Sequence, residues 1–221
     1  EKEEIAVSRD MLLAKLTKAH IHIAHVSSEY SLKIIEMGKK EGINITCEAT
    51  PHHFSFSDDE ILKNAYDTNF KMSPPLREIS DVKAVREALK SGLIDVIATD
   101  HAPHHTDEKI VEFDKAPFGI IGLQTLVPLT LKLVNEGVIS LERMVELTST
   151  NAAKMLNLKD KGRLAEGMLA DIAVIDPEIE YVYDEKINRS KSVNSPLFGK
   201  KLKGAATTTI KSGKIVYEFG K

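Results

Sequence analysis

Apolar residues in the first 160 positions fall into two kinds of pattern, short continuous runs and sets with helical spacing. Continuous β-rich runs predict strands at 21–26, 43–49 and 94–99. Helical spacing predicts a helix that starts near Leu32 and ends at Gly42, and further helices over 81–89, 120–135 and 141–156. Strands and helices that alternate through short connections predict a parallel α/β architecture, either a barrel or a doubly wound sheet.

The pattern changes after about residue 160, where strand signals replace helical ones. Residues 171–175 and 207–217 are β-rich, and the second stretch contains Ser212-Gly213, a pair that favours a hairpin turn. We therefore expect an α/β part over 1–160 and a small β-rich segment over 161–221. Only three or four strand–helix units can be counted, whereas a closed eight-stranded barrel takes about 250 residues. On length alone, the chain is a small open sheet or half of a barrel.

Composition and charge argue against several classes of protein. The 221 residues include 30 basic and 33 acidic side chains, so the net charge of -3 gives no basic field for nucleic acid. No apolar run reaches about 18 residues, which argues against a membrane span. The first ten residues are charged where a signal peptide would be apolar. The single cysteine, Cys47, cannot form an internal disulfide, so we expect a reducing cytoplasm.

Histidine and aspartate side chains gather just after the predicted strands. His25 follows the first strand, His52 and His53 follow the second, and the string Asp100-His101-Ala102-Pro103-His104-His105 follows the third. Because parallel α/β enzymes build active sites at the carboxyl ends of their strands, these side chains are candidates for one site. Imidazole and carboxylate groups hold zinc-type ions, which polarise carbonyls and supply hydroxide at neutral pH. A carboxylate beside such an ion can also take and return a proton.

Each of these side chains also has a structural interpretation. A single histidine at a strand end usually caps or packs, the pair His52-His53 could be ordinary loop polarity, and Asp100 could cap the following turn. His20 and His22 alternate along one strand, so we assign both a structural role. Cys47 lies mid-strand, where a core position is expected rather than a nucleophile. Taken singly these interpretations are favoured, but three such motifs at one sheet edge favour a metal-dependent hydrolase.

One string, Thr99 to His104 (TDHAPH), resembles the signature of dihydroorotases in the cyclic amidohydrolase superfamily. Further blocks resemble those of the family, in family order, at 22–28, 47–54, 71–77, 116–125, 151–158, 161–177 and 192–204. The resemblance thus spans essentially the whole chain. It implies an α/β fold, the C-terminal half of a (β/α)8 TIM-type barrel with a binuclear metal site, followed by a small β-rich domain.

The resemblance also implies roles for individual residues. His25 is similar to the family's ligand of one metal ion, and Asp100 to the residue that binds the other ion and acts as general base and acid. His104 is similar to a substrate contact, and Phe118-Gly119 to the loop whose backbone meets the pyrimidine ring. Ser73 stands where the family commonly has asparagine, so its hydroxyl is a weaker candidate for a substrate contact.

Further implied features concern the surroundings of the site. Glu48 and His52 fall in family blocks near the site and are expected to support its ligands, whereas His53 is expected to pack or orient. The resemblance implies two divalent metal ions, with zinc as the expected metal. Histidine and carboxylate sites also accept manganese or cobalt, so the sequence leaves the metal open.

Part of the family's site has no counterpart in this sequence. The family's N-terminal His-x-His pair, its bridging carboxylate and a further histidine precede the first block, and His20-Ile21-His22, which has the spacing, belongs to that block. By comparison with the family we expect a chain that lacks the N-terminal half of the barrel and is inactive alone. The implied partners are that missing half, a small-molecule substrate, and aspartate transcarbamoylase or a second copy of the chain.

The implied reaction is the reversible, metal-dependent cyclisation of N-carbamoyl-L-aspartate to L-dihydroorotate in de novo pyrimidine biosynthesis. Two alternatives remain: a related cyclic amidase of the allantoinase or dihydropyrimidinase type, or a non-catalytic scaffold for aspartate transcarbamoylase. Such scaffolds usually lose the ligands, whereas His25, Asp100 and His104 are retained here. The retained residues favour catalysis.

Overall fold

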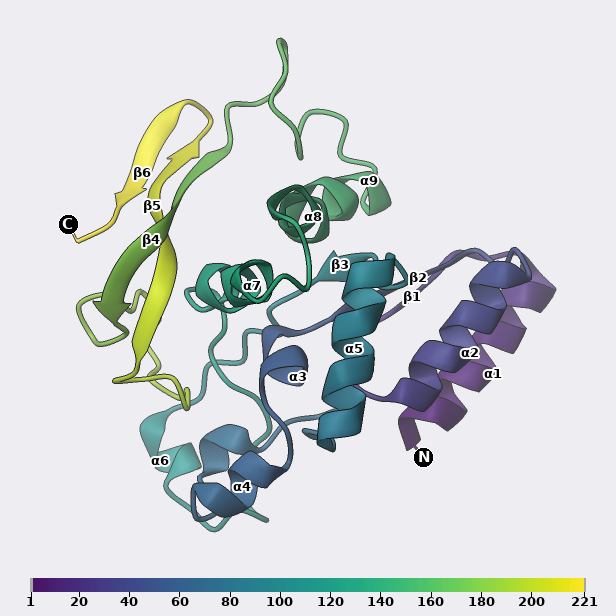
Figure 1. Ribbon diagram of the computed structural model, residues 1–221, viewed down its shortest axis with the longest axis horizontal. Coiled ribbons are helices and arrows are strands. Elements are labelled where there is room, and N and C mark those ends of the chain that lie inside the picture. Colours follow the sequence, from purple (N-terminus) through teal and green to yellow (C-terminus); the bar gives the residue numbers. More distant parts are fainter. Residues whose placement is uncertain (1, 221) are drawn as a thin grey trace.

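The computed structural model describes residues 2–220, which form two three-stranded sheets and a set of helices (Figure 1). Glu1 and Lys221, the outer ends of the two predicted segments, lie outside the described residues. The helices are α1 (Lys2–Thr17), α2 (Glu29–Lys40), α3 (Pro51–Ser55), α4 (Asp59–Lys63), the 3-10 helix η1 (Thr68–Phe70), α5 (Ile79–Ser91), α6 (Thr106–Lys109), α7 (Leu126–Asn135), α8 (Leu141–Val145), the π-helical η2 (Glu146–Thr150) and α9 (Asn151–Met155). The strands are β1 (Ile21–Ile23), β2 (Ile45–Ala49), β3 (Val96–Ile97), β4 (Ile172–Val182), β5 (Lys201–Lys211) and β6 (Lys214–Glu218).

The first sheet is parallel, in the order β1-β2-β3, which confirms the predicted parallel strands. Glu48 of β2 lies opposite Val96 of β3. All three strands are shorter than predicted. The backbone enters the left-handed region at His25 (φ 56°), after β1, and at Asp100 (φ 47°), after β3. These turns lift the chain out of the sheet at the edge where the candidate residues lie.

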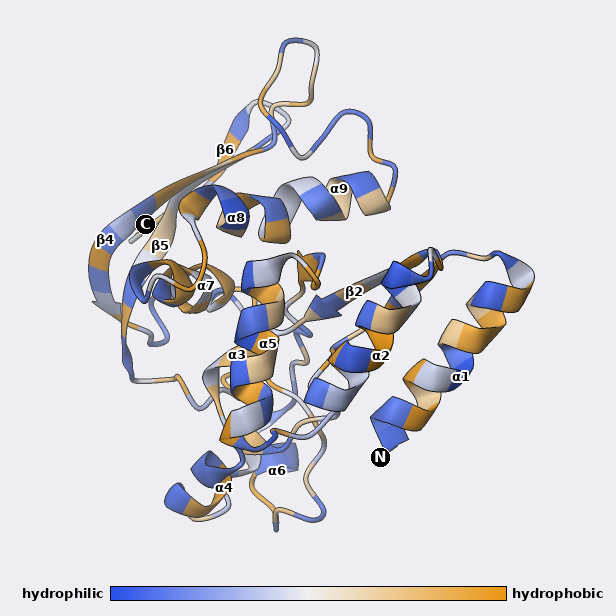
Figure 2. Ribbon diagram, turned by 45° about the vertical axis from the view of Figure 1, so that its right-hand side comes forward, coloured by the Kyte–Doolittle hydropathy of each residue, from blue (hydrophilic) through white to orange (hydrophobic). Residues whose placement is uncertain are grey.

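Helices α1, α2 and α5 form a row in which α2 contacts both neighbours (Figures 1 and 2). The Ser28 hydroxyl caps α2 by accepting the Ser31 amide, and left-handed Gly92 follows the last residue of α5. Apolar residues of this row form one buried cluster with the strands and with α7 and α8; members include Val26, Ile35, Cys47, Leu89, Leu131 and Leu147. The helices predicted from near Leu32 to Gly42 and over 81–89, and the core position of Cys47, are thus confirmed.

The helix predicted over 120–135 is wrong in its first part, because α7 starts only at Leu126. Ile120 instead forms a parallel bridge with His101, and the Ile121 amide donates to the Asn194 carbonyl oxygen. Backbone pairing with distant segments therefore takes the place of the first helical turns. The helix predicted over 141–156 is confirmed as the run α8, η2 and α9, with a π-helical turn in its middle.

The second sheet is antiparallel, in the order β4-β5-β6, and confirms the predicted hairpin. Ser212 (φ 50°) and Gly213 (φ 78°) connect β5 to β6, and two residues with positive φ give a turn whose twist suits paired strands. The sheet lies against α7 through β5 (Figure 1). The division into residues 1–160 and 161–221, and the membership of the first sheet in half of a barrel, remain predictions.

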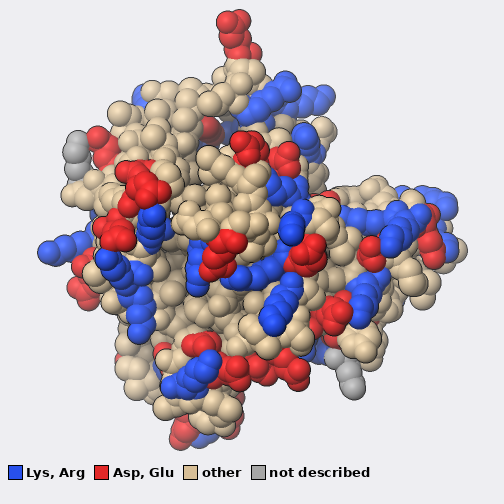
Figure 3. Space-filling view, in the orientation of Figure 1, with Lys and Arg blue, Asp and Glu red and all other residues tan. Residues whose placement is uncertain are grey.

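Charged side chains of both signs are interspersed over the face shown in Figure 3. This mixture agrees with the small net charge of -3. Within residues 2–220, no helix has both the length and the apolar character needed to cross a bilayer.

Candidate active site

The carboxyl ends of β1 and β3 bring together the two side chains predicted to bind metal. His25 follows β1, Asp100 follows β3, and His25 Nε2 lies 3.4 Å from Asp100 Oδ1. Both residues have positive φ, a conformation that costs a residue with a side chain about 1–2 kcal/mol. Strain of this kind clusters at functional sites, so two such residues in contact mark this edge as the candidate site.

Glu48, near the end of β2, connects this pair to the sheet. Its carboxylate oxygens lie 2.8 Å from His25 Nδ1 and 3.0 Å from His22 Nε2. The contact with His25 is close but poorly aligned for a hydrogen bond, so we describe it as an ion pair. Burial raises the pKa of Glu48, but the two histidines together lower it to about 2. Glu48 is therefore ionised, and its contact is the main cause that raises the pKa of His25.

A row of polar side chains continues from Glu48 along the same face of the sheet. The Thr46 hydroxyl lies 2.8 Å from His22 Nδ1 and 2.9 Å from His20 Nε2. His20 and His22 were assigned a structural role, and this row agrees with it, although His22 also contacts Glu48. The signal that could have revealed the row is the alternation of side chains on β1 and β2, which puts every second residue of two paired strands on one face.

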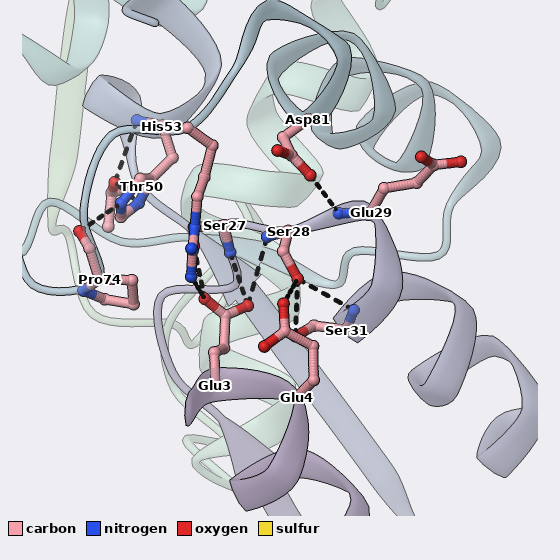
Figure 4. A network of polar contacts seen from close by, with 11 residues as sticks. Glu3, Glu4, Ser27, Ser28, Glu29, Ser31, Thr50, His53, Pro74 and Asp81 are labelled. Carbon is pink, nitrogen blue, oxygen red and sulfur yellow. Dashed lines mark hydrogen bonds and ion pairs between the residues drawn. The ribbon is translucent and has the colours of Figure 1, made fainter. Parts of the chain in front are cut away.

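His52 and His53 are buried in α3, so the interpretation of this pair as loop polarity is wrong. His53 contacts the Thr50 hydroxyl (2.8 Å) through Nδ1 and the Pro74 carbonyl oxygen (3.0 Å) through Nε2 (Figure 4). It thereby ties α3 to the segment that contains exposed Ser73, which precedes a cis peptide bond. Burial lowers the pKa of His52 well below its ordinary range, and its Nε2 has no hydrogen-bond partner within residues 2–220.

A second polar network holds the turn that follows His25 (Figure 4). The Glu3 carboxylate, from the start of α1, accepts the Ser27 amide (3.1 Å), the Ser27 hydroxyl and the Ser28 amide (3.3 Å). Arg77 donates to the same carboxylate (3.2 Å) and to the Ser27 hydroxyl (3.0 Å). Burial raises the pKa of Glu3, but its hydrogen bonds, led by Ser27, lower it overall. Sequence reasoning missed both Glu3 and Arg77, because the network joins three segments far apart in the chain.

The residues predicted to contact substrate include one pair that the structure brings together. His104 Nε2 lies 2.9 Å from the Phe118 carbonyl oxygen, so His104 and the Phe118-Gly119 loop are side by side. The Phe118 ring is 55% exposed. Gly119 has φ 99°, and an added Cβ would lie 2.6 Å from Ala102 Cβ, so this loop requires glycine. Ser73 lies at the surface, and its contact with substrate stays a prediction.

The donor atoms of His25 and Asp100 are of the kind that a divalent metal ion binds. His25 presents Nε2 toward Asp100 while Nδ1 faces Glu48, an arrangement in which a carboxylate orients a metal-binding imidazole. Among the described residues, no group of three or more His, Cys, Asp or Glu side chains could hold a metal ion. His25 and Asp100 therefore fit part of a coordination shell, and a complete shell needs further ligands.

Comparison with known proteins assigns the chain to a family. A family model described as the amidohydrolase family matches residues 11–216. The chain belongs to the amidohydrolase family. Within this family it is 51% identical over 216 residues to a dihydroorotase of Geobacter metallireducens and 48% identical over 219 residues to one of Aquifex aeolicus. The resemblance to dihydroorotases is thus confirmed. The two matches cover 98% and 99% of this chain but 50% and 51% of the relatives, so the chain spans about half the length of the curated relatives it matches.

Solved structures of amidohydrolases have a similar fold. The L-hydantoinase (dihydropyrimidinase) from Arthrobacter aurescens matches with a TM-score of 0.92 and 31% identity, over 99% of this chain and 49% of that one. The dihydropyrimidinase from Brevibacillus agri NCHU1002 matches with a TM-score of 0.91 and 25% identity, again over 99% of this chain and 49% of its own. The α/β fold class expected from the sequence is thereby confirmed at the level of the family.

Proposed function

We propose that this chain is part of a dihydroorotase, which interconverts N-carbamoyl-L-aspartate and L-dihydroorotate in pyrimidine biosynthesis. The observation that carries the proposal is the approach of His25 Nε2 to Asp100 Oδ1 at 3.4 Å, on the carboxyl edge of the parallel sheet. This pair occurs in a chain that is 51% identical to a dihydroorotase over 216 residues.

His25 and Asp100 would hold divalent metal ions, with zinc as the proposed metal and two ions in the complete site. When bound, such ions polarise the ring carbonyl and supply hydroxide at neutral pH. Asp100 would take a proton from the attacking water and return it to the ring nitrogen that leaves. Glu48, ionised beside His25, would hold the proton on Nδ1, which leaves the lone pair of Nε2 available to bind the metal.

Orientation of the substrate would come from the loops that follow Asp100. His104 and the Phe118-Gly119 backbone lie side by side and present an imidazole and peptide groups to one region. The Phe118 carbonyl oxygen, which keeps a second lone pair beside its contact with His104, would accept from an amide of a flat ring, and the Ser73 hydroxyl would add one hydrogen bond. Holding the ring in one orientation removes rotational freedom before the reaction, which lowers the barrier.

The proposed partners follow from the length of the relatives. Because the chain spans about half of them, we propose a second segment that completes the ligand shell. Aspartate transcarbamoylase or a second copy of the chain stays a proposed further partner on the resemblance to the family alone. Cys47 is buried and unpaired, and burial raises the pKa of its thiol to about 12. An inert, reduced thiol suits the cytoplasm, where we place the reaction.

Ring opening of L-dihydroorotate tests the proposal. It is measured in zinc-supplemented buffer with the chain alone and with the chain co-purified with the half of the Geobacter metallireducens dihydroorotase that it does not match. We expect no turnover by the chain alone, because its ligand shell is incomplete, and clear turnover by the co-purified pair. Asp100→Asn should lower that turnover by about a thousandfold, within the range for loss of a general acid–base.

Other outcomes would contradict specific parts of the proposal. Turnover by the chain alone would show that His25 and Asp100 belong to a complete site. Turnover of dihydrouracil or allantoin in place of dihydroorotate would assign a related cyclic amidase. A co-purified pair that binds zinc but opens none of the three rings would favour a non-catalytic scaffold.

A further inference from the structure

The carbonyl oxygen of Gly119 accepts hydrogen bonds from two side chains that come from distant parts of the chain. Lys109 Nζ lies 3.2 Å from it and Asn194 Nδ2 lies 3.3 Å from it. Both side chains belong to buried residues, 7% and 4% exposed. The Gly119 amide is also used, since it donates to the Lys71 carbonyl oxygen at 2.8 Å. Both polar groups of this one peptide position are therefore fixed by the protein.

Lys109, the last residue of α6, contacts this loop through its side chain. Its Nζ donates to the Pro117 carbonyl oxygen (2.9 Å) as well as to Gly119, so one ammonium group holds two carbonyls of the loop. The Thr68 hydroxyl, in turn, donates to the Lys109 carbonyl oxygen and ties its backbone to η1. A buried ammonium group loses hydration, and hydrogen bonds such as these two offset that cost.

Asn194 approaches from the segment that precedes β5 and joins two loops. Its Nδ2 donates to the Ala102 carbonyl oxygen (2.9 Å) as well as to Gly119, and its Oδ1 accepts the His104 amide (3.2 Å). The backbone carbonyl oxygen of Asn194 accepts a hydrogen bond from the Ile121 amide at 3.1 Å. A carboxamide combines a donor and an acceptor in one plane, which Asp and Leu of similar size do not.

We propose that Lys109 and Asn194 are positioning residues that fix the Phe118-Gly119 backbone beside His104. Neither residue reaches the metal-binding pair in the contacts described above, so they act through the loop. The catalytic consequence rests on the proposed function, in which this backbone meets the ring. The ordering of the loop does not rest on it and can be measured in the chain as it is.

Amide hydrogen exchange of the 221-residue chain tests the ordering, because the amides of Gly119 and Ile121 are both hydrogen-bonded, to the backbone carbonyl oxygens of Lys71 and Asn194 respectively. Lys109→Met and Asn194→Asp should each raise exchange at these two amides by about tenfold or more, while the hydrogen-bonded amides of Ser212 and Gly213 in the β5–β6 turn keep their rates. Lys115→Met is the matched control, since Lys115 is an exposed lysine of the same segment and, within residues 2–220, its ammonium group pairs only with exposed Glu112. It should change nothing. Asn194→Ser, which introduces no buried charge, replaces Asn194→Asp if that variant does not fold.

Unchanged exchange at Gly119 and Ile121 in both variants would overturn the inference. So would an equal rise at Ser212 and Gly213, which would show that the change is not confined to the loop. In the co-purified pair, a positioning role predicts that KM for dihydroorotate rises about tenfold while kcat stays within about threefold. If the pair without substitutions turns over no dihydroorotate, the proposed function fails, and the exchange result still decides the role of Lys109 and Asn194.

Discussion

At the scale of single residues, Lys109 gives the structure a pH dependence that can be worked out in sign. Burial lowers the pKa of Lys109 to about 8, with Asp67 acting to raise it and Lys71 to lower it. An unfolded lysine has a pKa of about 10.4. Between these values the unfolded chain carries a proton that the folded chain has released. The free energy of unfolding contributed by Lys109 therefore rises with pH across this window.

Urea unfolding at several pH values from about 7.5 to 10.5 measures this effect, because that range covers both pKa values. Relative to Lys109→Met, the unmodified chain should gain about 2–3 kcal/mol of unfolding free energy across the window. Comparison with the variant cancels the other titrating groups, including Tyr181 and Tyr183, whose pKa values burial raises to about 12. Parallel pH curves for the two proteins would show that Lys109 keeps its ordinary pKa.

The residues that the sequence could and could not reveal differ in how their contacts arise. His25 and Asp100 were predicted to share a site because both follow parallel strands, and the ends of such strands meet at one edge. Asn194 falls in the family-like block 192–204, but that resemblance does not reveal its role, since its bond to Ala102 joins positions 92 residues apart. Lys109 reads as one more charge in a polar segment, and only the packed structure shows that it is buried.

At the scale of elements, the close approach of β5 to α7 depends on Gly204. Gly204 has φ 88°, and an added Cβ would lie 2.3 Å from Leu131 Cδ1. Leu131 is 1% exposed, so its side chain has little room to move away. Gly199 has a similar φ of 77° but nothing within 4 Å of its added Cβ. Comparing alanine substitutions at the two positions therefore separates the free-energy cost of the backbone conformation from that of the clash.

We expect Gly199→Ala to lower the free energy of unfolding by about 1 kcal/mol, the cost of a left-handed residue with a side chain. Gly204→Ala should lower it by about 2–4 kcal/mol, because overpacking adds about 1–3 kcal/mol. In a Leu131→Ala background the added cost of Gly204→Ala should fall to the Gly199→Ala value. Urea denaturation of the four variants measures the difference. Equal costs at both glycines in the original background would mean that β5 does not press on α7.

Element boundaries were predicted well where local pattern decides them and badly where distant pairing does. Helix α5 and the β5–β6 hairpin follow from helical spacing and from Ser212-Gly213, so both were found. The stretch at Ile120 has the apolar spacing of a helix, yet its pairing with His101 and Asn194 keeps it out of α7. Hydrophobic periodicity reports which face of a segment is apolar and contains no information on such backbone partners.

At the scale of the whole molecule, the two sheets differ in how much they bury. Four of the five residues of β2 are buried, and the parallel sheet and its helices share one apolar cluster. In β4 no residue is buried, and in β5 only Gly204 and Ala205 are. Exposed apolar side chains on the antiparallel sheet include Val174, Val182, Ile215 and Val216. Because apolar burial supplies most of the free energy of folding, the antiparallel sheet is the less stable part.

Native-state hydrogen exchange at low urea concentrations should resolve this difference. Amides of β4 and β5 should exchange through a partial opening, at a free energy about 2 kcal/mol or more below that of β2, whose amides should require global unfolding. Gly204→Ala should lower the opening free energy of β4 and β5 and the global free energy reported by β2 by similar amounts, since both openings relieve its clash with α7. A single common free energy for all strands would contradict this hierarchy. It would mean that the few contacts of β5 with α7 are enough to make the two sheets unfold as one unit.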